Sequence, residues 1–499
     1  MVQEGDSPDI DSGQDAIPSV LAAHEALAAH LGDPLSASEM GAREMKGDVL
    51  VQEEASDVAA SAPPVVTRLF AKASATAMLQ GASSIMAFVL AVLLARFLGS
   101  RGYGHYALAF AWSTLLGVPA ILGLNTFLVR GIAVYEVRKQ WALMKGLLFR
   151  ANQLVLISSS AIAVFGIAVA VIFLSPSFRD PFCVAMLLVP VTSLTLLRQG
   201  AMQGFGRVVQ GQFPEYLVRP LLIIVGVIML QFLGNGALTP TTALGANLIG
   251  VAVAFVVGVL MLRRAIPAVL RTVYPEYLTR EWLRVSLPMM LISGVWIANN
   301  YLTTLIVGAL DGARGAGIYT AVQKGAEVIV ILLYATNMAL APAIARLHAA
   351  KDWSGLERTT EHMARATLFV SAPVAIVFMV FPHLYLGLFG ASFQAGATAL
   401  VILALGQLIN AAAGPSGNVL LMTGQERVAV AGVGVGLVAN IVLAVALVPL
   451  FGVTGGAIAF ASSLVLWNTV LVVLARRLVG INVTAFGILS IRSRRRSGV

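Results

Sequence analysis

The sequence predicts an all-α, polytopic membrane protein of about twelve transmembrane helices, arranged as two lobes of six helices each. Three observations support this fold class: 58% of the 499 residues are hydrophobic, only 11% are charged, and two motifs recur in corresponding loops of the two halves. Soluble domains carry about 25% charged residues. A chain with so few charges and a mean hydropathy of +0.86 needs lipid as its surroundings.

Long apolar stretches define the expected helices. A helix needs roughly 20 apolar residues to cross a hydrocarbon core of about 30 Å. Such stretches recur along most of the chain, and no Asp, Glu, Lys or Arg occurs between Arg365 and Glu426. In the first half we expect helices at 70–95, 104–124, 148–174, 182–202, 215–233 and 241–262. In the second half we expect helices at 285–309, 318–343, 366–389, 396–414, 428–449 and 455–475.

The two ends of the chain differ in charge from the apolar body. Residues 1–65 contain 13 acidic and 2 basic residues, which predicts a disordered, acidic cytoplasmic tail. Between the ends we expect an N-terminal lobe at 66–264, a cytoplasmic linker at 265–282 and a C-terminal lobe at 283–480. The last segment, 481–499, is expected to be a basic cytoplasmic tail.

Lysine and arginine are distributed unevenly between the loops. Loops that follow odd-numbered helices contain four basic residues, whereas loops that follow even-numbered helices contain eighteen. Cytoplasmic loops are the ones enriched in Lys and Arg. We therefore expect the even-numbered loops and both termini in the cytoplasm. This topology also explains the pI of about 9.9 without nucleic-acid binding, because the cations are spread over many loops.

Two short motifs occur twice at nearly the same spacing. Gly99-Ser-Arg-Gly-Tyr-Gly-His-Tyr106 matches Gly312-Ala-Arg-Gly-Ala-Gly-Ile-Tyr319 at five of eight positions, 213 residues later. Met202-Gln-Gly-Phe-Gly-Arg-Val208 matches Met422-Thr-Gly-Gln-Glu-Arg-Val428 at four of seven positions, 220 residues later. Together they indicate duplication of a six-helix unit, and because six is even the halves share one orientation. Such parallel repeats typically place a substrate site between the halves.

Several segments resemble the oligosaccharide flippase, or polysaccharide transporter, family, within the superfamily that includes the multidrug and toxin extruders. The resemblance begins with Leu94-Ala-Arg-Phe-Leu-Gly-Ser-Arg-Gly-Tyr-Gly and Leu122-Gly-Leu-Asn-Thr-Phe-Leu-Val-Arg130. It continues through 340–346, 402–408 and 422–427, and it covers roughly residues 68–480. The chain departs from the family in two places: Thr303 stands where many relatives carry an aspartate, and the acidic tail has no obvious counterpart.

The resemblance implies a V-shaped carrier of two lobes that works by alternating access. It would move a polyprenyl-diphosphate-linked oligosaccharide across the bacterial cytoplasmic (inner) membrane for export of a surface polysaccharide. The implied partners are this lipid-linked substrate, membrane lipids, a polysaccharide polymerase and export proteins, and no cofactor is expected. Physical reasoning agrees with this substrate class, because a charged headgroup cannot cross hydrocarbon unaided.

Charged residues inside the expected helices are candidates for the substrate path. Lys324 and Glu327 lie three residues apart within 318–343, and an ionisable residue in a span is a functional candidate together with its partner. Two interpretations remain open: contact with phosphate or sugar, and an ordinary ion pair near the membrane surface. Arg130 lies near the expected cytoplasmic end of its helix, where it could meet a diphosphate. Positive-inside topology alone also explains Arg130.

Uncharged polar residues inside helices are the other candidates. Asn299 and Asn300 lie near the middle of the helix at 285–309, where facing lipid would be costly, so we expect them to face another helix or the lumen. The same reasoning applies to Gln80, Asn125, Gln407, Asn410 and Asn440.

Other polar features favour ordinary structural roles. Glu215 and Arg219 follow Pro214, which is typical of a helix start, so we interpret them as structural. The six histidines have no metal-ligand spacing, and the sequence contains neither a phosphate-binding loop nor an HExxH motif. We therefore expect neither an ATP-driven pump nor an enzyme.

Three classes of function remain in competition. The leading class is a lipid-linked oligosaccharide flippase. The second is a drug or metabolite antiporter of the same two-lobed architecture, which would depend on a membrane acid such as Glu327. The third is a membrane scaffold in a polysaccharide assembly complex. A major facilitator carrier is disfavoured, because its signature between the second and third helices is missing.

Overall fold

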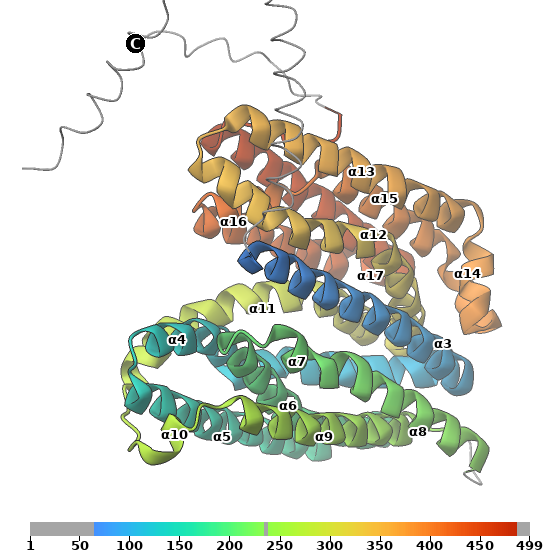
Figure 1. Cartoon of the computed structure of the whole chain (residues 1–499). Coiled ribbons are helices and arrows are strands. Elements are labelled where there is room, and N and C mark those ends of the chain that lie inside the picture. The colour runs from blue at the N-terminus through green and yellow to red at the C-terminus, as the bar shows by residue number, and fades with distance from the viewer. Residues whose placement is uncertain (1–63, 234–237, 487–499) are drawn as a thin grey trace, which may run out of the picture. The chain divides into compact units, whose positions relative to one another are not determined.

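The computed structural model describes residues 64–233 and 238–486, and residues 71–499 form one compact unit. The described chain is helical and contains no strand (Figure 1). The first half comprises α3 (Pro64–Ile121), α4 (Leu124–Val137), α5 (Trp141–Phe173), α6 (Pro176–Gly204), α7 (Val208–Phe213), the π-helix η1 (Pro214–Val218), α8 (Arg219–Leu233), α9 (Pro240–Ala265) and α10 (Val269–Thr272). The second half comprises α11 (Thr279–Leu310), α12 (Gly312–Ala349), α13 (Trp353–Val380), α14 (Pro382–Phe389), the 3₁₀ helix η2 (Ala391–Gly396), α15 (Ala397–Ala413), α16 (Ser416–Met422) and α17 (Glu426–Leu478).

The expected membrane-spanning helices are all found. Among the described residues, nine helices are long and apolar enough to cross a membrane. Two of these nine, α3 and α17, each join two expected helices through a glycine, Gly99 and Gly452. The 38-residue α12 covers the expected helix at 318–343. The prediction of an all-α membrane protein with about twelve spans is therefore confirmed. The acidic tail, 1–65, lies outside the described residues except for its last two positions.

A positive φ at glycine allows the chain to change direction between two apolar helices. Gly99 has φ 66° and Gly452 has φ 54°, values that residues with a Cβ rarely adopt. Figure 1 shows the blue ribbon of α3 turning back at this bend. Gly312, which matches Gly99 in the repeated motif, also has a positive φ of 80°. The repeated glycine therefore makes the same kind of turn in both halves.

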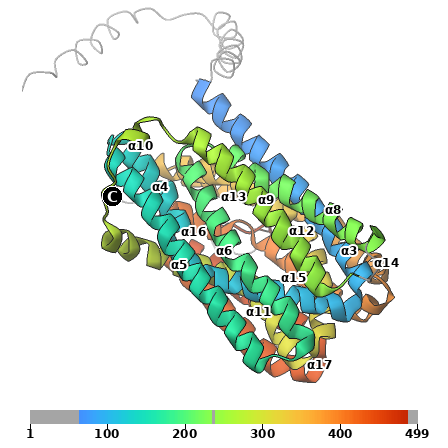
Figure 2. The same cartoon turned by 90° about the horizontal axis from the view of Figure 1, so that it is seen from below.

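Helices of the same half pack on one another. In the first half α6 lies against α4, α5 and α9, and in the second half α15 lies against α12, α13 and α17. Figure 1 shows α4 to α9 below and α12 to α17 above, and in the view from below in Figure 2 α4, α5, α6 and α9 lie in front of the second half. Helix α11 joins the two groups, because it packs against both α17 and α4. At its start Trp282 Nε1 donates a hydrogen bond to Tyr135 Oη at 3.0 Å.

The end of the bundle that holds Gly99 and Gly312 is here named the Gly99 end, and the opposite end is named the Arg130 end. At the Gly99 end the two copies of the repeated motif touch through their backbones. A Cβ on Gly104 would overlap the carbonyl oxygen of Ala313, and a Cβ on Gly317 would overlap that of Ser100. Since Ser100 corresponds to Ala313 and Gly104 to Gly317, the contact is reciprocal. Small residues let membrane helices approach this closely.

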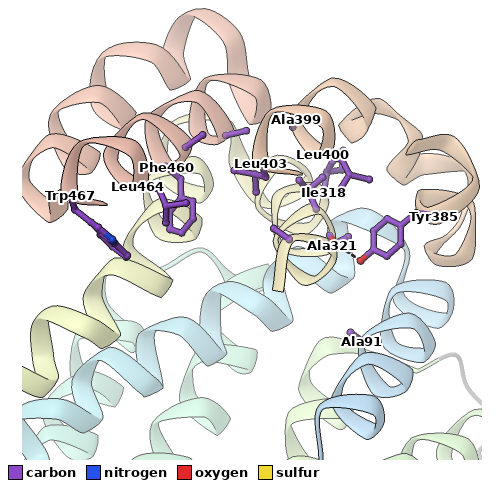
Figure 3. Close-up of a cluster of buried hydrophobic side chains, with 14 of the residues drawn as sticks. Ala91, Ile318, Ala321, Tyr385, Ala399, Leu400, Leu403, Phe460, Leu464 and Trp467 are labelled. Carbon is purple, nitrogen blue, oxygen red and sulfur yellow. Dashed lines mark hydrogen bonds between the residues drawn. The ribbon is translucent and has the colours of Figure 1, made fainter. Parts of the chain in front are cut away.

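Aromatic and aliphatic side chains extend the contact at the Gly99 end. The rings of Tyr103 and Phe393 lie 6.1 Å apart, and Arg96 Nε donates to the carbonyl oxygen of Leu388 at 2.6 Å. Figure 3 shows Tyr385 pointing toward Ala321, whose carbonyl oxygen accepts the tyrosine hydroxyl at 3.0 Å. The hydrophobic cluster that includes Tyr103 and Tyr385 contains residues of both halves.

The chain after α17 differs from expectation. The sequence assigns 481–499 to a basic tail, but Ile481, Val483 and Ala485 are buried. The Ala485 amide donates to Ala412 O at 2.9 Å, and Arg365 Nε donates to Ala485 O at 2.8 Å. The apolar residues of 481–485 alternate with polar ones, so one side of this short segment packs on the second half. The remaining residues, 487–499, lie outside the described chain.

The reciprocal glycine contact predicts a large effect of a single methyl group. Gly104→Ala places a Cβ against the backbone of α12, and overpacking of this kind costs about 1–3 kcal/mol. We expect a lower melting temperature of the purified protein in detergent. The matched control is Gly245→Ala in α9, where a Cβ meets no atom within 4 Å and the substitution is expected to be neutral or stabilising. Equal melting temperatures for the two variants would contradict the contact.

Candidate functional site

A cavity of about 520 Å³ lies between the two halves and is lined by α3, η1, α8, α9, α11 and α12. Its walls carry two cations and two carboxylates. Arg219 and Glu215 come from the first half, and Lys324 and Glu327 come from the second. Hydroxyl and amide side chains complete the polar lining, among them Tyr106, Asn247, Tyr301, Thr304, Thr320 and Gln323. We name this space the central cavity.

The first-half charges belong to a hydrogen-bond network. Arg219 Nη1 donates to Glu215 Oε1 at 2.5 Å, and Arg219 Nη2 donates to Asn247 Oδ1 at 3.1 Å. Asn247 Nδ2 donates to Tyr106 Oη at 3.2 Å, which connects η1, α8, α9 and α3. The side chains of Arg219 and Glu215 are only 19% and 12% exposed. π-helical turns such as η1 are frequent at functional sites.

The second-half charges form a more open pair. Lys324 Nζ donates to Glu327 Oε2 at 2.7 Å, and the two side chains are 32% and 47% exposed. Gln323 is held beside them, because its Nε2 donates to Asn300 O at 2.8 Å and its Oε1 accepts from Thr304 at 3.3 Å. Each cation of the central cavity therefore has a carboxylate partner, and the four charges sum to zero.

The structure gathers the expected site residues into three cavities. Lys324, Glu327 and Asn300 line the central cavity. Asn300 and Glu327 also line a narrow cavity of about 40 Å³, together with Asn299, Gln407 and Asn410. In it Asn410 Nδ2 donates to Gln407 Oε1 at 3.0 Å, and both side-chain polar atoms of Asn299 are buried without a partner among the described residues.

The remaining expected residues line neither the central cavity nor the narrow cavity. Arg130 and Asn125 line a third cavity, of about 460 Å³, at the Arg130 end. Gln80 lines none of these three cavities. Asn440, expected to face another helix or the lumen, is fully buried and exchanges hydrogen bonds with Thr303 at 2.9 and 3.2 Å.

Sequence reasoning missed the first-half contribution to the central cavity. Glu215 and Arg219 do lie where a helix begins after Pro214, but their side chains also line the cavity. The signal that could have identified them is an acid and a base four residues apart in an otherwise apolar helix. Tyr106 and Asn247 carry no comparable signal, because single polar residues in helices are common.

No group of three or more His, Cys, Asp or Glu residues that could hold a metal ion occurs in the described part of the chain.

Solved structures share this arrangement of helices. An inward-facing multidrug resistance MATE family transporter of the MOP superfamily superimposes with a TM-score of 0.68 at 15% identity, covering 80% of this chain and 94% of its own. A MOP superfamily transporter from Pyrococcus furiosus, described as having a binding pocket of reverse polarity, gives 0.57 at 16% identity and covers 81% and 94%. A MATE structure in a bent conformation gives 0.54 at 14% identity and covers 81% and 93%. A search of curated proteins gave no match.

The chain therefore has the two-lobed, multi-pass membrane fold of these structures. The chain belongs to the polysaccharide biosynthesis protein family, whose family model matches residues 69–348. The MatE family model matches residues 288–446, within the second half. The resemblance to the polysaccharide transporter family is thereby confirmed.

The network around Arg219 predicts non-additive effects on stability. Arg219→Met leaves the carboxylate of Glu215 buried without its cation, which typically costs about 3–5 kcal/mol. We expect a marked loss of melting temperature, largely recovered in the double variant Glu215→Gln/Arg219→Met. Arg179→Met is the control, because the Arg179–Asp180 pair is 39% and 64% exposed and such surface pairs contribute about 0–1 kcal/mol. A double variant as unstable as Arg219→Met would show that the pair is not coupled.

Proposed function

We propose that this protein is a flippase that moves polyprenyl-diphosphate-linked oligosaccharide repeat units across the cytoplasmic membrane for surface polysaccharide export. The observation that carries the proposal is the lining of the central cavity, to which each half contributes one cation, Arg219 and Lys324. Membership in the polysaccharide biosynthesis protein family supports the same cargo. Alternating access of the two lobes is the proposed mechanism.

The lining of the central cavity suits a headgroup that combines phosphate with sugar. Charge-assisted hydrogen bonds from arginine or lysine to phosphate are among the strongest that proteins make. Tyr106, Tyr301 and Thr320 add hydroxyls, and Asn247, Asn300 and Gln323 add amides, which can both donate to and accept from sugar hydroxyls. A diphosphate arriving at Arg219 or Lys324 would compete with the carboxylate of Glu215 or Glu327 for the same cation.

The distribution of basic residues gives the proposed carrier an orientation. Positive-inside topology places the Arg130 end in the cytoplasm and the Gly99 end outside. In this orientation the glycine contact closes the central cavity toward the outside. The superposition on an inward-facing transporter supports the same state. We propose a bacterial inner-membrane location with both termini in the cytoplasm, beside a polysaccharide polymerase and export proteins.

A drug or metabolite antiporter is the second candidate, and Glu327 is the observation that favours it. This carboxylate lines the central cavity and is 47% exposed, so it could bind a cationic substrate or a proton. Both carboxylates of the central cavity are paired with cations, however, which lowers their capacity to attract a cationic drug. The flippase accounts for the paired charges better.

Deletion of the gene tests the proposed cargo directly. We expect lipid-linked repeat units to accumulate in the inner leaflet while surface polysaccharide disappears, because the headgroup cannot cross hydrocarbon without a carrier. The measurement is extraction and quantification of lipid-linked oligosaccharide, with the intact gene on a plasmid as the control. Unchanged surface polysaccharide would refute the flippase.

Lys324→Ala tests the role of the central cavity. Removing this cation takes away a charge-assisted contact with phosphate and leaves Glu327 uncompensated, so we expect export to be abolished at normal protein abundance. Surface polysaccharide in a complemented deletion strain is the readout. The control is Lys351→Ala, which removes an exposed lysine just beyond the far end of α12. Normal export by the Lys324 variant would exclude a role of this cation in transport.

A further inference from the structure

The cavity at the Arg130 end has the composition of an anion receptor. Its polar lining consists of Arg130 and Asn125 from α4, Gln199 and Gln203 from α6, and the hydroxyl of Thr126. Arg130 is the one charged residue in this lining, and it belongs to none of the four ion pairs found among the described residues. The cavity measures about 460 Å³, and its apolar wall includes Leu196 and Met289.

The four nitrogen-bearing side chains of this cavity do not contribute hydrogen bonds that stabilise the fold. None of Asn125, Arg130, Gln199 and Gln203 makes a side-chain hydrogen bond to another described residue. Gln199 is 8% exposed, and its Nε2 is buried without a partner. A buried amide that lacks its hydrogen bond is destabilising. A ligand that accepts hydrogen bonds would recover this free energy.

Helix geometry explains why these side chains converge. Residues 196, 199, 200 and 203 lie on one face of α6, and 125, 126, 129 and 130 lie on one side of α4. A Cβ on Gly200 would overlap the backbone of Asn125, so the two helices touch at this point. The polar faces therefore line this cavity, and Met289 of α11 borders it from the second half.

An intermediate cavity of about 240 Å³ lies between this site and the central cavity. It shares Leu196 and Gln199 with the cavity at the Arg130 end, and it shares Glu215, Arg219 and Tyr301 with the central cavity. Ser193 Oγ and Glu215 Oε2, both in its wall, are also buried without a partner among the described residues. Unpartnered polar groups thus continue from Gln199 to Arg219.

We infer that the cavity around Arg130 is a separate anion site that binds a phosphate-bearing lipid headgroup before the central cavity does. The inference rests on the proposed function for its preferred ligand, the diphosphate of a prenyl-linked sugar. An arginine fork with three amides around it supplies donors for several phosphate oxygens. Arg130 can bind an anion without displacing a carboxylate, whereas Arg219 and Lys324 cannot. The phosphate of an ordinary anionic phospholipid offers the same chemistry.

Equilibrium binding of farnesyl diphosphate to the purified full-length protein in detergent tests the site. We expect Arg130→Gln to weaken binding by about tenfold or more, because a hydrogen bond to a charged group contributes roughly 1.5–3 kcal/mol. Gln199→Met, which keeps the volume and removes the amide, should weaken binding to a smaller extent. Arg138→Gln is the matched control, since it removes the same charge from an exposed position next to the end of α4.

A second experiment distinguishes the diphosphate of a prenyl-linked sugar from the phosphate of an ordinary phospholipid as the ligand. Competition with phosphatidylglycerol in mixed micelles should leave farnesyl diphosphate binding intact if the site prefers the diphosphate. If phosphatidylglycerol binds in an Arg130-dependent way and farnesyl diphosphate does not, the anion site is supported but its ligand is an ordinary phospholipid. Equal affinities of the Arg130 and Arg138 variants for both probes would overturn the site. Binding is measured without transport, so unchanged surface polysaccharide in the deletion strain would remove the proposed cargo and leave this result standing.

Discussion

The close backbone contact between the two copies of the repeated motif determines the rest of the architecture. Gly104 and Gly317 bring α3 and α12 together at the Gly99 end, where neither position tolerates a Cβ. Lipid offers helices little hydrophobic reason to associate, so packing of small residues supplies the contact instead. Farther along both helices from these glycines, Ala107 on α3 and Thr320 and Lys324 on α12 line the central cavity. The contact therefore fixes one end of that cavity.

Polar side chains inside the bundle differ in how many of their hydrogen-bonding atoms have a partner. This difference distinguishes residues that stabilise the helix packing from residues that line the cavities. Asn440 and Thr303 satisfy each other in the interior of the second half, which is what a buried structural pair requires. The Arg219 network is nearly complete, but Glu215 Oε2 lacks a partner. Unpartnered atoms also occur on residues that line cavities, Gln199 and Ser193 in the first half and Asn299 in the second.

The sequence predicts the framework well because apolar length and loop charge act locally along the chain. Helix positions follow from stretches of apolar residues, and the repeated motif contains the glycines Gly99 and Gly312, which have positive φ values. Side-chain convergence depends on how helices rotate about their axes, which hydropathy does not specify. Gln80 and Asn300 looked alike in the sequence, yet only Asn300 lines the central cavity. Glu215 and Arg219 were assigned to helix-start chemistry for the same reason.

The duplication supplies a symmetric framework, whereas the chemistry built on it is asymmetric. Extending the repeat spacing of 213 residues pairs Lys324 with Ala111 and Glu327 with Thr114, so the second-half charges have no charged counterpart in the first half. Ala111 and Lys324 nevertheless both line the central cavity, which shows that the helices keep their relation while the residues have diverged. The first half carries its ion pair on η1 and α8 instead. A headgroup with two chemically different ends, diphosphate and sugar, is better matched by such unequal walls than by a symmetric pair.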